Sequence, residues 1–300
     1  GTFLFTSQPK LEGLALAEMK PVVIPARDGL KLNAYLTLPV GIEPRNLPLG
    51  LLVHGGPWAR DGWGYNPMAQ WFANRGYACL MVNYRGSTGY GKSFLHAADK
   101  QWGLKMHDDL IDSVKWAVQQ GYVDSKKVAI FGGSYGGYAA LAGVTFTPDF
   151  FACAVDIVGP SNLKTLIASI PPYWKPMRSL FDTRMGNVDD PKDAELINNA
   201  SPLYKADKIV KPLLIGQGAN DPRVKQAESE QIVAAIEKNK GRVTYVLYPD
   251  EGHGFARPEN RIDFNARAEV FLAESLGGRY EPMTGERVPG STAVVKVVAP

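Results

Sequence analysis

A serine flanked by glycines is the feature of this sequence best suited to chemistry. The run Gly132-Gly133-Ser134-Tyr135-Gly136 has the pattern G-x-S-x-G and follows the apolar residues Val128 to Phe131. Small apolar residues typical of a buried helix come next, from Tyr138 to Val144. A strand, a sharp turn and a helix in this order lift the serine hydroxyl clear of its neighbours, and a side chain at either flanking glycine would collide there. We therefore predict that Ser134 is a nucleophile and not a serine in an ordinary glycine-rich loop.

Such a serine needs a base within hydrogen-bond reach, and the base needs a third group to orient it. The sequence has four histidines. His253 lies between two glycines just after a strand-like run, in a loop that could carry it toward Ser134. His54 ends an early apolar strand, and His96 and His107 lie in polar, helix-like stretches typical of surface histidines. We therefore choose His253 as the base.

The acid is expected between the serine and the histidine in the chain, as this kind of turn predicts. Asp221 follows the buried, strand-like residues 213–216 and is the one carboxylate of its loop. Asp156 ends another apolar run, and Asp250 is too close to His253 in sequence to face its ring easily. An aspartate before proline often serves only as a turn former. Its place at a strand end and the chain order favour Asp221 as the acid.

Two backbone N–H groups are expected to bind the oxyanion that forms in acyl transfer. The first belongs to Tyr135, next to the nucleophile at the start of a helix, where free amides and the helix dipole favour negative charge. The second is that of Gly56, in the loop His54-Gly55-Gly56-Pro57 after an earlier strand. The glycines of this loop are also explained by a tight turn, and both explanations can hold together.

Strand-like apolar runs alternate with helix-like stretches along most of the chain. This alternation predicts an α/β fold with a mostly parallel central sheet covered by helices on both faces. Residues 21–26 and 30–38 predict a hairpin around Arg27-Asp28-Gly29. Further strands are expected at 49–53, 77–82, 128–131, 153–158, 212–215 and 243–248, and helices at 68–75, 108–120, 138–144, 226–239 and 260–275.

Five motifs together resemble the catalytic domain of the prolyl oligopeptidase family of serine peptidases, in the style of its acylaminoacyl-peptidase branch. They are His54–Pro57, Asn83–Gly91, Gly132–Tyr138, Asn220–Val224 and Glu251–Phe255, in family order. The resemblance implies an α/β-hydrolase fold and a triad of Ser134, Asp221 and His253. It also implies that Arg223 binds a substrate backbone carbonyl near the scissile bond.

The sequence departs from the family in two places. Some branches have a tyrosine where His54 stands and use its hydroxyl in the oxyanion hole, so here the donor should be the Gly56 amide. The family usually carries an N-terminal β-propeller, whereas residues 1–20 resemble only the end of a propeller and a linker. We therefore expect an excised catalytic domain at 21–278, followed by a polar tail at 279–300.

An insertion at 159–211 interrupts the strand and helix alternation between the sixth strand and the acid strand. It contains Pro171-Pro172-Tyr173-Trp174 and several apolar residues. It could form a lid or an apolar pocket wall for a substrate side chain or acyl group. For any single residue, ordinary helical packing is the more common role.

Composition narrows the function classes. The net charge of +3 and the absence of a basic stripe argue against nucleic acid as a partner, and no apolar run is long enough to span a bilayer. Cys79 and Cys153 lie in apolar runs, which predicts buried free thiols and favours the cytoplasm, although a removed leader would be invisible. We expect no metal and no cofactor, and the sequence leaves open whether the chain forms a homo-oligomer.

Three functions stay open at this point. The chain is a peptidase acting on short or N-acylated peptides, a carboxylesterase acting on small acyl esters, or a hydrolase-like module that only binds. The complete set of Ser134, Asp221 and His253 argues against the binding module. Arg223 favours the peptidase, because a cation that holds a peptide carbonyl is not needed for a simple ester.

Overall fold

A nine-stranded sheet forms the centre of the computed structural model, which describes residues 1–299. The strand order across the sheet is β1-β2-β4-β3-β5-β6-β7-β8-β9. The strands are β1 (Met19–Pro25), β2 (Lys31–Thr37), β3 (Leu47–Val53), β4 (Ala78–Asn83), β5 (Val123–Gly133), β6 (Cys153–Ile157), β7 (Leu213–Gly218), β8 (Val243–Tyr248) and β9 (Val294–Val298).

The middle of the sheet is parallel, from β4 through β3, β5, β6 and β7 to β8. The outer strands pair antiparallel, with β1 against β2, β2 against β4, and β9 against β8. The central strands are almost continuously apolar because helices cover both of their faces. The expected hairpin is present, and its turn at Arg27-Asp28-Gly29 is closed by a hydrogen bond from the Gly29 N–H to the Ala26 carbonyl.

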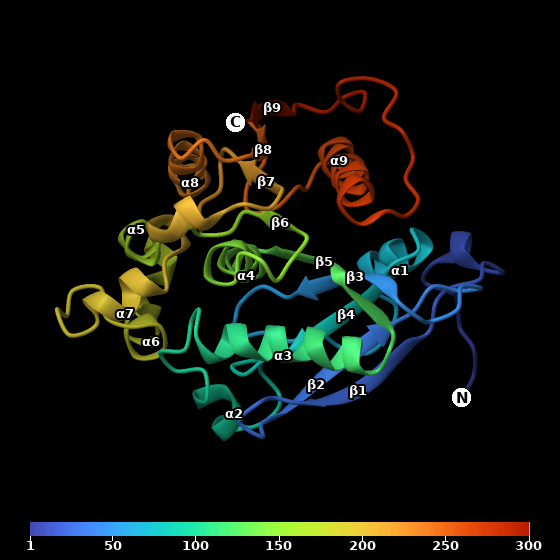
Figure 1. The fold of residues 1–300 in the computed structure, drawn as a ribbon, viewed down its shortest axis with the longest axis horizontal. Helices are drawn as coiled ribbons and strands as arrows, with labels where there is room; N and C mark the ends of the chain where they lie inside the picture. Colours follow the sequence, from blue (N-terminus) through green and yellow to red (C-terminus); the bar gives the residue numbers. More distant parts are fainter. Residues whose placement is uncertain (300) are drawn as a thin grey trace.

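Helices cover the sheet on both faces, as predicted (Figure 1). Helices α3, α4 and α8 share one hydrophobic core with one face, and α1 and α9 share a second core with the other. The helices are α1 (Pro67–Asn74), α2 (Lys92–His96), α3 (Lys105–Gln119), α4 (Tyr135–Phe146), α5 (Leu163–Ala168), α6 (Arg178–Arg184), α7 (Ala194–Asn199), α8 (Gln226–Lys238) and α9 (Pro258–Leu276). Short 3₁₀ helices lie at η1 (Pro9–Leu11), η2 (Pro172–Met177) and η3 (Pro202–Lys208).

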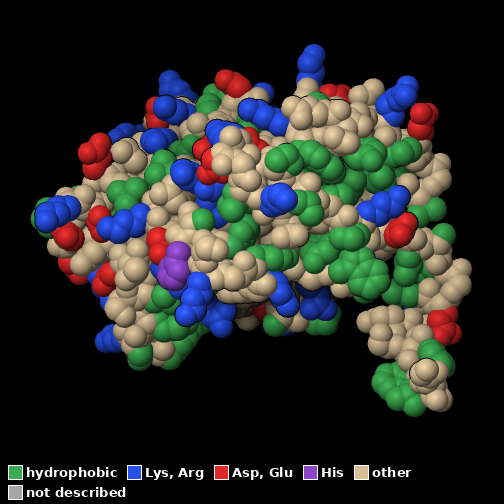
Figure 2. All heavy atoms as spheres, turned by 90° about the horizontal axis from the view of Figure 1, so that it is seen from below, with side chains coloured by type: hydrophobic (Ala, Val, Ile, Leu, Met, Phe, Trp, Pro, Cys, Tyr) green, Lys and Arg blue, Asp and Glu red, His purple; other side chains and the backbone are tan. Residues whose placement is uncertain are grey.

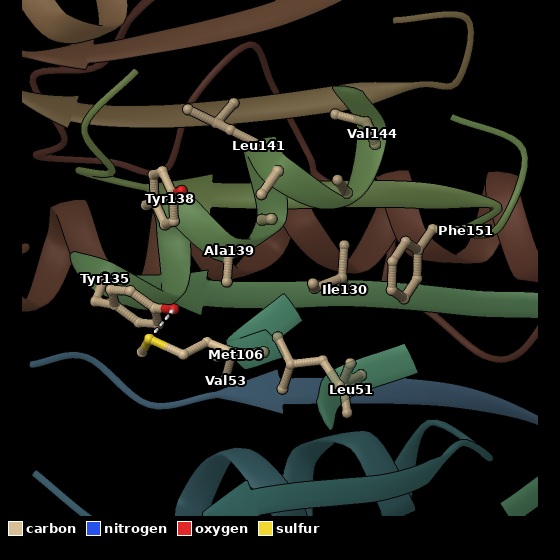
Figure 3. Close-up of a cluster of buried hydrophobic side chains, with 14 of the residues drawn as sticks. Leu51, Val53, Met106, Ile130, Tyr135, Tyr138, Ala139, Leu141, Val144 and Phe151 are labelled. Carbon is tan, nitrogen blue, oxygen red and sulfur yellow. Dashed lines mark hydrogen bonds between the residues drawn. The ribbon is translucent and has the colours of Figure 1, made fainter. Parts of the chain in front are cut away.

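Helix α4 lies against the middle of the sheet and carries almost no polar side chains. Figure 3 shows Ala139, Leu141 and Val144 of this helix over Ile130 of β5, with Phe151 beside them. Burying a leucine or valine side chain contributes roughly 1.5–3 kcal/mol, so this contact holds the start of α4 firmly on the end of β5. The serine turn between these two elements is therefore anchored on both sides.

Residues 279–299 differ from the polar tail expected at 279–300, of which residue 300 lies outside the described part of the chain. The chain returns to the sheet there, and β9 becomes its edge strand by pairing with β8 through five residue pairs from Val243–Val298 to Leu247–Val294. A run of Gly, Pro and charged residues from 277 to 290 hides this strand in the sequence. Strand β5 is also longer than predicted, because residues 124–127 in its first half are polar and at least partly exposed.

The surface in Figure 2 carries lysine and arginine side chains interspersed with acidic and hydrophobic ones. Both cysteines are buried and free, as expected. Within residues 1–299, no helix is both long and apolar enough to cross a membrane.

Candidate active site

Three predicted site residues follow the carboxyl ends of parallel strands. Ser134 follows β5, Asp221 follows β7 and His253 follows β8. Parallel strands end at the same edge of a sheet, and open α/β sheets form their sites at that edge. The strand order therefore brings together side chains that are separated by up to 119 positions in the chain.

The three side chains make a continuous line of hydrogen bonds. His253 Nδ1 lies 2.7 Å from Asp221 Oδ2, and His253 Nε2 lies 3.0 Å from Ser134 Oγ. A carboxylate only accepts, so the ring proton is on Nδ1 and Nε2 is left to accept from the serine hydroxyl. This is the arrangement in which a histidine can take a proton from a serine.

Asp221 is held in place on both of its oxygens. Oδ1 accepts the backbone N–H groups of Arg223 at 2.8 Å and Val224 at 2.9 Å, while Oδ2 accepts from His253. The side chain is fully buried, whereas that of His253 keeps 15% of its surface exposed. Because Asp221 is fixed and enclosed, the imidazole is oriented while its other nitrogen stays accessible to the serine.

The turn at Ser134 is strained, as predicted from its glycines. Ser134 has φ 58° and ψ −116°, a backbone conformation that costs free energy for any residue but glycine. A Cβ at Gly132 would lie 2.6 Å from the Gly136 backbone, and one at Gly136 would lie 2.1 Å from the Val53 carbonyl oxygen. The two flanking glycines are therefore required by backbone contacts on both sides of the serine.

Replacing Gly136 by alanine is expected to destabilise the protein. Its new methyl group meets backbone that cannot rotate away, so we expect the free energy of unfolding to fall by at least about 1–3 kcal/mol. Denaturant unfolding monitored by circular dichroism measures this change. Gly133→Ala is the matched control, since its nearest contact is 3.8 Å away at the Ile157 oxygen. Equal unfolding midpoints for the two variants would contradict the steric explanation.

The two predicted oxyanion donors have free N–H groups. Among residues 1–299, neither the Tyr135 N–H nor the Gly56 N–H has a hydrogen-bond acceptor. The Tyr135 side chain lies in the core, with its hydroxyl against the sulfur of Met106 (Figure 3). The loop of Gly56 runs beside the serine, because a Cβ on Gly55 would lie 3.4 Å from Ser134 Cβ.

Arg223 lies on the acid loop, with its side chain exposed. The guanidinium carbon lies 5.7 Å from the ring centroid of Trp174, which belongs to η2 in the insertion. It forms no ion pair with any of the residues that the structure describes, 1–299. Within these residues, Arg223 is therefore not a surface arginine held by a neighbouring carboxylate.

The other acidic candidates bond to partners other than His253. Asp156 is fully buried, its Oδ1 accepts the Gly159 N–H at 2.8 Å, and burial raises the pKa of its carboxyl well above the usual range. Asp250 pairs instead with Arg257.

The remaining histidines also have other partners. His54 Nε2 lies 2.9 Å from Ser87 Oγ, its ring stacks on Tyr84, and burial lowers its pKa to about 4. His54 is therefore neutral near pH 7 and braces the loop before Gly56. His96 is exposed, as expected. The expectation for His107 was wrong, because its ring is buried beside Phe146 and bonds to Thr147 Oγ1 at 3.1 Å.

One residue of the site region was missed although its motif was noticed. Glu251 is buried, and its carboxylate accepts the backbone N–H groups of Ala256 at 2.8 Å and Arg257 at 2.9 Å. These bonds close the loop that carries His253. A glutamate two positions before a glycine-flanked histidine was the available signal, but its partners are backbone groups that no side-chain pattern reveals.

The insertion at 159–211 contains residues that pack in the core and a residue that lies beside the candidate site. Nine of its apolar residues belong to the core, as ordinary packing predicts, namely Leu163, Leu166, Ile167, Phe181, Met185, Ile197, Ala200, Ala206 and Ile209. Trp174 is only partly buried and contacts Arg223. No cluster of His, Cys, Asp or Glu within residues 1–299 is grouped so that it could hold a metal ion.

This sheet, with a strained serine turn after β5 and a histidine loop after β8, defines an α/β-hydrolase domain. Comparison with known families and structures agrees with this class. Residues 63–279 match the sequence model of the prolyl oligopeptidase family. The chain belongs to the prolyl oligopeptidase family.

The names of several similar proteins refer to peptidases. The chain is 57% identical over 305 residues to dipeptidyl aminopeptidase BIII of Pseudoxanthomonas mexicana, covering 99% of this chain and 44% of that protein. It is 43% identical over 314 residues to dipeptidyl peptidase family member 6 of Caenorhabditis elegans, covering 97% and 42%. A puromycin-hydrolyzing peptidase of Mycobacterium tuberculosis superposes with a TM-score of 0.83 at 28% identity, covering 91% and 41%. The chain thus spans less than half the length of each of these proteins.

Proposed function

We propose that this chain is the catalytic part of a serine peptidase that cleaves short or N-acylated peptides through an acyl-enzyme on Ser134. The hydrogen-bonded line from Asp221 through His253 to Ser134 carries this proposal. The site provides a nucleophile, a base of the correct tautomer and a buried carboxylate, the three parts that acyl transfer by serine needs.

In the proposed first step, His253 Nε2 takes the hydroxyl proton while Ser134 Oγ attacks the scissile carbonyl carbon. The negative charge moves to the carbonyl oxygen, where the N–H groups of Tyr135 and Gly56 stabilise it. Asp221 stabilises the imidazolium. His253 then gives its proton to the leaving amine, the C–N bond breaks, and the acyl group stays on Ser134. Water repeats these steps with Nε2 as base and releases the acid.

The substrate class follows from the relatives and from Arg223. Two relatives above 40% identity have dipeptidyl names, so a dipeptide anilide is the first substrate to test. The resemblance to acylaminoacyl peptidases makes an N-acylated amino acid anilide the second. Arg223 offers a fork of donors to a carbonyl on the acyl side of the scissile bond, which a short ester lacks.

Covalent labelling combined with matched substrates tests this function. A fluorophosphonate should label the protein at one serine, and the protein should hydrolyse dipeptide anilides as well as p-nitrophenyl esters. Hydrolysis of the esters alone would favour the carboxylesterase. Absence of both labelling and turnover would favour a module that only binds.

Arg223→Ala separates the peptidase from the esterase. We expect kcat/KM for a dipeptide anilide to fall roughly 10- to 100-fold, because a charged hydrogen bond contributes about 1.5–3 kcal/mol. The rate on a short acyl ester should be nearly unchanged. Steady-state kinetics on both substrates measures the difference. Equal losses on the two would mean that Arg223 supports the loop of Asp221 instead of the substrate.

A further inference from the structure

A row of aromatic rings crosses the insertion between two loops of the candidate site. Trp58 contacts Phe181 with ring centroids 5.4 Å apart, and Phe181 contacts Trp174 at 5.8 Å. Each end of the row is covered by a cation. The Arg184 guanidinium lies 5.4 Å from the Trp58 ring, and that of Arg223 lies 5.7 Å from the Trp174 ring.

The row connects segments that are far apart in the sequence. Trp58 comes two positions after Gly56, on the loop after β3, and Arg223 comes two positions after Asp221, on the loop after β7. Phe181 in α6 and Trp174 in η2 belong to the insertion. Helices α5, α6 and α7 of this insertion gather on the left of Figure 1, away from the N-terminus. Only the folded insertion therefore brings an aromatic ring to Arg223.

The Trp174 ring is well placed to restrict the arginine. Phe181, the next ring in the row, is only 6% exposed, so Trp174 rests on the hydrophobic core. The arginine side chain has several rotatable bonds and is exposed, and among residues 1–299 no carboxylate pairs with it. A guanidinium over the face of a tryptophan is attracted by the ring quadrupole. Because this contact already restricts the Arg223 side chain, less conformational entropy is lost when a substrate binds to it.

We propose that Trp174 is a positioning residue that holds Arg223 in the orientation for binding a peptide carbonyl. The insertion thereby sets the preference for peptides over simple esters, without touching the reacting atoms. This inference rests on the proposed function, because it assigns Arg223 to the acyl side of a peptide substrate. Trp174 acts through Arg223, so its effect should disappear when the arginine is absent.

Trp174→Ala is expected to raise KM for a dipeptide anilide about two- to five-fold with little change in kcat. This range is the strength of an exposed cation–π contact converted to a ratio of binding constants. Hydrolysis of a p-nitrophenyl ester should be unchanged. Trp174→Phe should restore most of the peptide rate, because it keeps an aromatic face. Met177→Ala, an exposed apolar residue of the same 3₁₀ helix, is the matched control and should match the parent protein.

The double variant Trp174→Ala, Arg223→Ala decides whether the two residues act together. Its kcat/KM for the anilide should equal that of Arg223→Ala alone, since Trp174 then has nothing to position. If the losses of the two single variants multiply in the double variant, the inference is overturned. It is also overturned if Trp174→Ala slows the ester as much as the anilide, or does not affect the anilide at all.

A second measurement separates this inference from the proposed function. The two single variants and the double variant are also compared in denaturant unfolding, which reports the contact itself without any substrate. Coupling between the two substitutions supports the contact, and its absence overturns the positioning role alone. If Arg223→Ala affects anilide and ester equally, the proposed substrate contact of Arg223 fails whatever the coupling.

Discussion

Ser134→Ala is expected to abolish covalent labelling by a fluorophosphonate and to lower kcat by about 10³-fold or more. The hydroxyl is the group that His253 Nε2 contacts at 3.0 Å, and members of such a triad act as a unit, so loss of one removes most of their joint effect. The fold should be retained, because the Ser134 side chain closes no contact in the core. Mass spectrometry of the labelled protein and turnover of a dipeptide anilide measure the two effects.

The control for this experiment is Ser93→Ala. Ser93 is an exposed serine of α2 and should label and turn over like the parent. Labelling that persists at another serine in the Ser134→Ala protein would mean that the nucleophile lies elsewhere.

Asp221→Asn is expected to lower kcat by up to about 10⁴-fold, which is the second of the two largest effects that we predict. The asparagine oxygen can still accept the N–H groups of Arg223 and Val224, so the loop should keep its shape. Its amide nitrogen then faces His253 Nδ1 and donates to it. The ring proton is driven to Nε2, which can no longer accept from the serine hydroxyl. Turnover of the anilide and the unfolding midpoint together measure this result.

Asp156→Asn, which changes the other candidate for the acid, is the control for Asp221→Asn. Asp156→Asn changes a buried group that bonds to the Gly159 N–H and does not contact His253. We expect it to alter stability more than kcat. A greater loss of kcat in Asp156→Asn than in Asp221→Asn would mean that the acid lies near the end of β6 and not in the loop after β7.

Much of the candidate site is local and could therefore be predicted from the sequence. The backbone at Ser134 can double back only between glycines, so the pattern itself specifies a strand, a turn and a helix. The alternation of apolar runs predicted the parallel sheet, since strands buried on both faces need continuous apolar residues. Once the sheet is parallel, the loops after β5, β7 and β8 must lie at one edge.

Other features depend on contacts between distant segments, which a single sequence does not encode in any local pattern. Strand β9 is hidden because edge pairing uses backbone groups, and the residues before it resemble a loop. His107 lies in a polar stretch, yet α3 turns it toward Phe146. The bonds from Glu251 to backbone amides have no signature in side-chain types.

The sequence by itself determined the class of site, through the glycines around Ser134 and the order of serine, aspartate and histidine in the chain. The sequence favoured Asp221 over Asp156 as the acid, but only the tertiary structure shows that Asp221 is the one bonded to His253, because this contact depends on which strand lies next to β8. It also decided what Arg223 contacts. Trp174 is 49 positions away, in an insertion that has no periodic pattern. Its ring meets the Arg223 guanidinium only because the packing of the insertion, through Phe181, places the ring there.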